Sequence, residues 1–154
     1  MGADFNGKSR GYLAEELPIQ FQKPAFERVL FLGESMNPSL EELKKAVLRL
    51  EEALQQPKND FLRDSVIQRF EFSIELAWKT SKKMMGTGTA SPKDVIREMA
   101  QSGYIQDIDI WLESIDMRNL SSHTYKEDLA EKVYDFVVRF LPYLKSLVEY
   151  LKTK

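Results

Sequence analysis

The sequence predicts an all-α fold: an antiparallel up-and-down four-helix bundle with one extra short helix and an irregular N-terminal arm. Apolar residues recur at helical spacing through most of residues 37–154, and no segment alternates polar and apolar residues as a strand does. Short breaks separate the apolar stretches, which favours helices that pack against their neighbours in sequence. Residues 1–36 are interrupted by glycines and prolines at short intervals, so we interpret them as a loosely ordered or docked arm.

The first two predicted helices have clear boundaries. Ser39 and Glu42 have the spacing of a capping box, which begins a one-faced amphipathic helix. A second helix begins near Asn59 and ends at Gly86. Besides its main apolar stripe, it carries three apolar residues on nearly the opposite side, namely Leu62, Phe72 and Leu76. A helix that is apolar on two sides must be covered on two sides, so we expect a homodimer.

Three further helices complete the bundle. Pro92 in a first helical position and Asp94 in the first turn predict a short helix over residues 91–102, inserted between two main helices. Another helix begins near Asp107 and leads into residues 118–125. The last begins between residues 126 and 128 and carries a broad apolar band toward the end of the sequence.

Composition excludes several classes of function. The chain has 154 residues, 43% of them hydrophobic, and 22 basic against 24 acidic side chains give a net charge of -2. Any contact with nucleic acid must therefore come from a local patch. With no cysteine and one histidine, disulfides, thiolate zinc sites and multi-histidine metal sites within one chain are excluded, and we expect no cofactor. No apolar run approaches the roughly 18 residues of a membrane span, and we expect a cytoplasmic protein without membrane contact.

Two short motifs have plain explanations. The loop Gly86-Thr87-Gly88-Thr89 follows no strand and lacks the lysine of a phosphate-binding loop, so we interpret it as an interhelical connection. The pair Asp107 and Asp109 lies where a helix dipole favours acids, which explains it without a metal.

A polar row runs along the second helix. Glu71, Glu75 and Lys79 follow one another at i, i+4 spacing, and Glu75 before Lys79 is typical of a stabilising surface pair. We favour that interpretation. Because the row lies beside two apolar faces, the alternative is that Glu75 and Lys79 line an interface or a binding pocket.

The stretch RNLSSHTY, residues 118–125, contains the single histidine. On a continuous helix Arg118 and His123 would lie about 140° apart, which is poor geometry for one site. Either the helix unwinds near residues 121–124, which serine and threonine side chains favour, or a second copy of the chain completes the site. The alternative is that both cations merely suit a helix end.

These residues resemble the Arg-x4-His-x-Tyr motif of HEPN-like helical proteins, in the branch called nucleotidyltransferase substrate-binding proteins, related to HepT toxins. Three stretches are similar to that branch and stand in its order: RDSVIQRFEFSIELAWKT (63–80), SPKDVIREM (91–99) and IWLESIDMRNLSSHTY (110–125). The resemblance covers residues 37–154 and not the arm. It implies a helical bundle that dimerises and works beside a separately encoded minimal nucleotidyltransferase.

The resemblance also implies roles for single residues. Arg118 and His123 correspond to the pair that forms a metal-independent ribonuclease site across the dimer in related toxins, and Tyr125 to the tyrosine that a partner enzyme modifies. Imidazole transfers protons near neutral pH and a guanidinium holds phosphate by two hydrogen bonds, so the residue types suit RNA cleavage. Asn119 and Ser122 are candidate supporting donors.

Three functions follow as hypotheses. We favour a substrate-binding partner subunit of a minimal nucleotidyltransferase in a toxin–antitoxin-like pair, with Tyr125 as a nucleotidylation target. The second is an endoribonuclease toxin with Arg118 and His123 as its catalytic residues. The third is a non-catalytic bundle that holds a nucleotide or phosphate, and possible ligands therefore include RNA and nucleotides.

Overall fold

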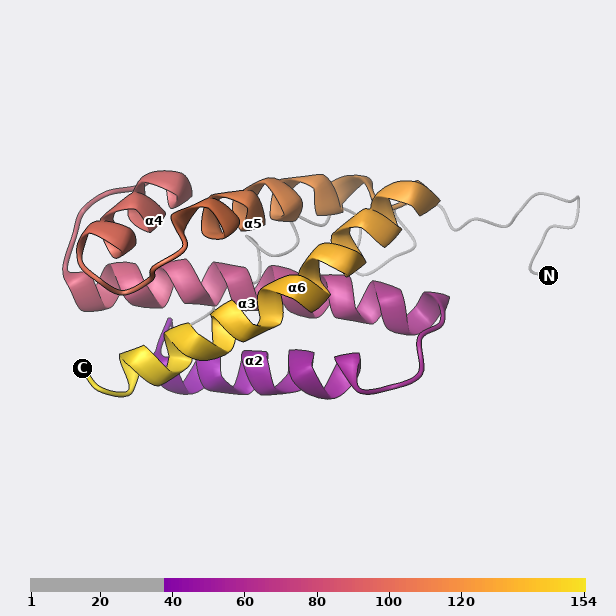
Figure 1. Ribbon diagram of the computed structural model, residues 1–154, viewed down its shortest axis with the longest axis horizontal. Coiled ribbons are helices and arrows are strands. Elements are labelled where there is room, and N and C mark those ends of the chain that lie inside the picture. The colour runs from indigo at the N-terminus through magenta and orange to yellow at the C-terminus, as the bar shows by residue number, and fades with distance from the viewer. Residues whose placement is uncertain (1–37) are drawn as a thin grey trace, which may run out of the picture.

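A computed structural model describes residues 38–154, and within this range the chain contains only helices and loops (Figure 1). The predicted all-α class is confirmed, and the predicted arm at residues 1–36 lies outside the described residues. No helix in the described range is long and apolar enough to cross a bilayer. In chain order the elements are α2 (Leu40–Leu54), α3 (Asp60–Met85), α4 (Pro92–Gln101), α5 (Ile108–Leu120), the 3₁₀ turn η3 (Ser121–His123) and α6 (Glu127–Leu151).

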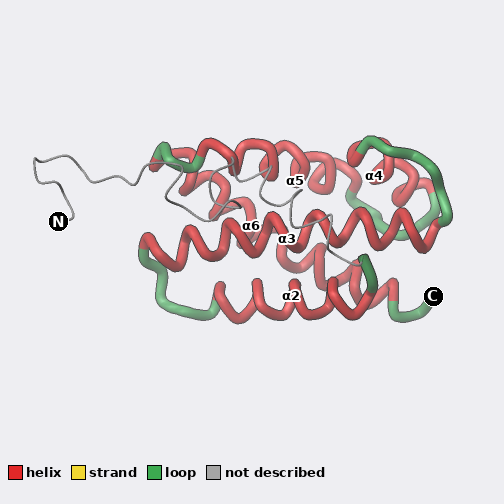
Figure 2. The backbone as a smooth tube through the Cα atoms, turned by 180° about the vertical axis from the view of Figure 1, so that it is seen from behind, coloured by secondary structure: helices red, strands yellow, loops and turns green. Residues whose placement is uncertain are grey.

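Helix α3 is the centre of the arrangement. It contacts α2, α4, α5 and α6, and Figure 2 shows it between α5 and α2 on the face opposite to that of Figure 1. Helix α6 runs obliquely across α3 in Figure 1 and also contacts α2 and α5. The short α4 packs against α3 and α5, as expected of an insertion between two bundle helices.

Aromatic side chains join α3, α5 and α6 in the core. The ring of Phe70 on α3 packs edge-on against Phe136 and Phe140 of α6, with centroids 6.0 and 6.2 Å apart. Trp111 of α5 meets Phe140 at 4.8 Å, also edge-on. Such pairs add about 0.5–1.5 kcal/mol each to the burial of their apolar surface. This cluster fixes how α6 crosses the other helices.

The predicted helix ends are confirmed. The Ser39 hydroxyl accepts the backbone N–H of Glu42 at 3.2 Å and begins α2. The Asn59 side chain accepts the N–H of Leu62 at 2.8 Å and begins α3. Gly86 ends α3 with φ of 71°, a left-handed conformation that glycine adopts without the steric penalty of a side chain.

Arg63, in the first turn of α3, fixes the start of α6. Its buried Nη1 donates to Glu131 Oε2 at 3.0 Å and to Glu127 Oε2 at 2.6 Å. The hydrogen bonds to Glu131 and then to Glu127 raise the pKa of Arg63. Hydrogen bonds from Lys58 and Arg63 lower the pKa of Glu131. These contacts therefore hold one end of the connection between α5 and α6 in place.

The core position of Phe70 leads to a stability prediction. Phe70→Ala removes a ring that is 0% exposed and leaves a cavity, so we expect a loss of about 3–5 kcal/mol in the free energy of unfolding. The matched control is Phe61→Ala on the same helix, whose ring is 89% exposed and whose loss should stay within about 0.5 kcal/mol. Urea denaturation followed by circular dichroism measures both, and similar midpoints for the two variants would contradict the described core.

Candidate functional site

The polar row of α3 faces the interior rather than solvent. Glu71 and Glu75 are both buried, and Glu75 is 0% exposed. Lys79 Nζ lies 3.4 Å from Glu75 Oε1 and is partly buried itself. The interpretation of Glu75 and Lys79 as a surface pair was therefore wrong. The row lies between the two apolar sides of α3, and its first two members are buried with the residues of the core.

Arg118, near the end of α5, is the partner of this row. Its side chain is 4% exposed and its Nη1 donates to Glu75 Oε2, which joins α5 to α3. Its Nη2 donates to Asn119 Oδ1 at 3.1 Å. A guanidinium offers donors in a planar fork, so one Arg118 side chain binds the buried carboxylate and the more exposed amide together.

Ser121 adds a second link between the same helices. Its Oγ lies 2.5 Å from Glu71 Oε2 and 2.6 Å from the carbonyl oxygen of Arg118. The hydroxyl has one hydrogen, which it donates to one of the two acceptors at a time. Lys79 lies at the edge of this cluster, where its ammonium is a second basic group beside the buried carboxylate of Glu75. Opposite charges placed together offset part of the cost of taking each one out of water.

The helix unwinds three residues after Arg118, at Ser121, which is one of the two alternatives that the sequence left open. Helix α5 ends at Leu120 and the 3₁₀ turn η3 covers Ser121–His123. The Ser122 hydroxyl donates to the Asn119 carbonyl at 3.0 Å, and the Thr124 hydroxyl donates to the Ser121 carbonyl at 3.1 Å. Side-chain hydroxyls thus satisfy carbonyls that a continuing helix would have used.

The unwinding divides the motif into an interior and an exterior part. His123 is exposed, and Tyr125 is 78% exposed. Their rings meet edge to face with centroids 6.1 Å apart. Arg118, in contrast, is directed to Glu75 in the interior. The structure therefore brings Arg118 together with Glu75, Lys79 and Asn119, and places His123 and Tyr125 at the surface with Ser122 between the two groups.

Sequence reasoning placed Glu71 in the polar row without naming it as a site residue, and it missed Ser121. Glu71 stands one helical turn before Glu75, and Ser121 stands three residues after Arg118, so each shares a face with its neighbour in the cluster. That periodicity was the available signal. Within the described residues no group of three or more acidic or histidine side chains is placed to hold a metal ion.

Comparison with known proteins identifies the family. Residues 38–153 match the family described as "Nucleotidyltransferase substrate binding protein like". The chain belongs to this family. A curated relative from Haemophilus influenzae, named "Probable ribonuclease HepT", is 35% identical over 103 residues, which are 62% of this chain and 70% of the relative.

Two solved structures resemble this member of the nucleotidyltransferase substrate-binding family. One is from Haemophilus influenzae and is described as the fold of a substrate binding domain of a nucleotidyltransferase. Its TM-score is 0.66 at 32% identity, over 73% of this chain and 98% of that one. The other is a crystal structure from Thermus thermophilus, with a TM-score of 0.64 at 31% identity. That match covers 70% of this chain and 96% of the Thermus chain. The resemblance seen in the sequence is thus confirmed, and with it the substrate-binding fold.

The buried pair leads to a second stability prediction. Glu75→Gln removes the carboxylate while Arg118 stays charged in the interior, so we expect a loss of about 3–5 kcal/mol in the free energy of unfolding. The control makes the same change in an exposed ion pair, in which Glu149 Oε2 lies 2.9 Å from Lys152 Nζ. Glu149→Gln should lower the free energy of unfolding by less than about 1 kcal/mol. Chemical denaturation compares the two, and equal losses would show that the buried pair contributes no more than a surface pair.

Proposed function

We propose that this chain is the substrate-binding partner subunit of a separately encoded minimal nucleotidyltransferase, in a toxin–antitoxin-like pair. We further propose that Tyr125 receives the nucleotide. The exposure of the Tyr125 ring, 78%, carries this proposal. A side chain modified by another enzyme must enter that enzyme's active site, and Tyr125 reaches solvent from a short connection that needs no unfolding.

The family supports the existence of a partner enzyme, because a substrate-binding domain acts together with a nucleotidyltransferase. In the transfer step, the Tyr125 oxygen would attack the α-phosphorus of the nucleotide, and pyrophosphate would leave. A protonated phenol is a weak nucleophile, so a base of the partner must take its proton. Within the described residues, His123 lies beside the Tyr125 ring, with ring centroids 6.1 Å apart, and its imidazole would assist that base.

Incubation with the co-encoded nucleotidyltransferase, ATP and magnesium should add nucleotide mass to the wild-type chain but not to Tyr125→Phe. Intact-mass spectrometry measures the adduct. The matched control is Tyr143→Phe on α6, whose ring is partly buried in packing against the core and which should be modified like the wild type. An adduct that persists in Tyr125→Phe, or no adduct on the wild type, would contradict the role of Tyr125.

A second function, metal-independent RNA cleavage, is favoured by one specific observation, the relative named "Probable ribonuclease HepT". In this proposal His123 transfers protons and Arg118 stabilises the phosphate in a homodimer. Because Arg118 is buried against Glu75 whereas His123 is exposed, the RNA phosphate would have to displace Glu75 from the guanidinium or meet an Arg118 that has moved outward.

If the chain cleaves RNA, activity should survive EDTA, and His123→Ala should lower it by roughly 10²- to 10⁴-fold through loss of proton transfer. Arg118→Lys should also lose activity, since an ammonium lacks the planar fork. Asp128→Asn, at an exposed position in the first turn of α6, serves as the control that retains activity. Equal cleavage by wild type and His123→Ala on a mixed RNA pool would identify a contaminating nuclease. If the wild type does not cleave the RNA, the ribonuclease proposal is wrong. The partner function and a non-catalytic nucleotide-binding role are then the remaining hypotheses.

A further inference from the structure

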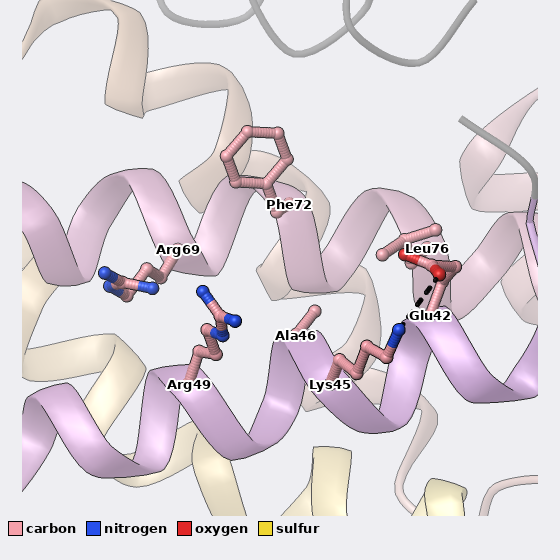
Figure 3. Close-up of a pocket in the computed structure, with 7 residues that line it drawn as sticks. All are labelled: Glu42, Lys45, Ala46, Arg49, Arg69, Phe72 and Leu76. Atoms are coloured by element: carbon pink, nitrogen blue, oxygen red, sulfur yellow. Dashed lines mark ion pairs between the residues drawn. The ribbon is translucent and has the colours of Figure 1, made fainter. Parts of the chain in front are cut away.

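A groove between α2 and α3 gathers positive charge at a place that residues 118–125 do not reach. Lys45 and Arg49 line it from α2, Arg69 and Phe72 from α3, and its volume is about 360 Å³ (Figure 3). We call it the α2–α3 groove. A neighbouring hollow shares Lys45, Arg49 and Arg69 and continues toward the end of α2. The volume is in the range of small-ligand sites.

Arg49 and Arg69 place two positive charges side by side in the groove. Figure 3 shows the guanidinium groups of Arg49 and Arg69 beside one another, between the two helices. Within residues 38–154 neither forms an ion pair with a carboxylate, and the Arg69 Nε donates instead to the neutral Ser65 hydroxyl at 3.2 Å. Guanidinium groups keep their charge, so holding two of them together is unfavourable without an anion.

The surroundings of the arginines favour a compact anion. Glu42 in the first hollow forms an ion pair with Lys45 at 3.7 Å, so the positive charge that remains in the groove is that of Arg49 and Arg69. Glu52 lines the second hollow and would repel a phosphate backbone that continued along it. Phe72 adds a half-buried apolar ring on the wall beside the cations, suited to stack against a base. Because Phe72 belongs to the second apolar side of α3, the proposed site requires this part of that side to stay open in the expected homodimer.

We propose that the α2–α3 groove binds a nucleoside triphosphate, with the phosphates on Arg49 and Arg69 and the base against Phe72. Arginine suits this role because its donors match phosphate oxygens two at a time. The site is distinct from the cluster around Arg118 and does not depend on modification of Tyr125. A subunit of this kind would hold a nucleotide on its own surface.

Calorimetric titration of the chain, residues 1–154, with ATP in EDTA tests the site. We expect the wild type to bind, and the double variant Arg49→Gln with Arg69→Gln to bind at least about 100-fold more weakly, since each charged contact is worth at least about tenfold. Affinity should also fall as salt is added. The control is Arg97→Gln, an exposed arginine of α4 paired with Asp94 at 2.7 Å, which should bind as the wild type does.

The role of the base is tested with inorganic triphosphate. Wild type should prefer ATP over triphosphate several-fold, and Phe72→Leu should remove that preference while keeping the apolar volume. Circular dichroism checks that each variant folds. No ATP binding by the wild type, or equal binding by the double variant, would overturn the site. A third outcome is that the wild type binds single-stranded RNA but not ATP, and that the double variant loses the RNA binding. The groove would then bind an extended polyanion, and the proposal of a nucleotide site would be wrong.

Discussion

The buried ion pair between Glu75 of α3 and Arg118 of α5 is the interaction on which the geometry around the motif depends. Two charges taken out of water are stable only when each finds its opposite and further hydrogen bonds satisfy the remaining polar atoms. Around this pair, Lys79 Nζ lies 3.4 Å from Glu75 Oε1, Arg118 Nη2 donates to Asn119, and Ser121 joins the end of α5 to Glu71. The pair therefore aligns α5 with α3 and determines which way the end of α5 faces.

The position of the remaining motif residues follows from that alignment. With Arg118 held inside, a continuing helix would have carried the next residues along the bundle, but the serines and threonine end it in a 3₁₀ turn. The Arg63 contacts hold the start of α6 on the other side of the connection. His123 and Tyr125 are thus presented at the surface by a segment fixed at both ends.

Local patterns predicted the helices well and the site only in part. Capping residues and apolar spacing are encoded over a few positions, which is why Ser39, Asn59 and Gly86 marked real helix ends. Glu75 was misjudged because i, i+4 spacing is the same on a surface and in an interior. What decides between them is Arg118, 43 residues away in sequence. An ion pair between residues so far apart in sequence produces no periodic pattern near either residue.

The Glu75–Arg118 pair also makes the two proposed roles of residues 118–125 differ in free-energy cost. These roles are modification of Tyr125 and cleavage of RNA. For Tyr125 to be modified, nothing in the described structure has to move, because its ring already lies in solvent. For Arg118 to hold a scissile phosphate, its buried contact with Glu75 must be exchanged, and breaking such a pair without a replacement costs about 3–5 kcal/mol. An RNA phosphate would have to supply that replacement. A substrate role is therefore compatible with the single chain as it stands, whereas catalysis requires a rearrangement that a second subunit or the RNA must stabilise.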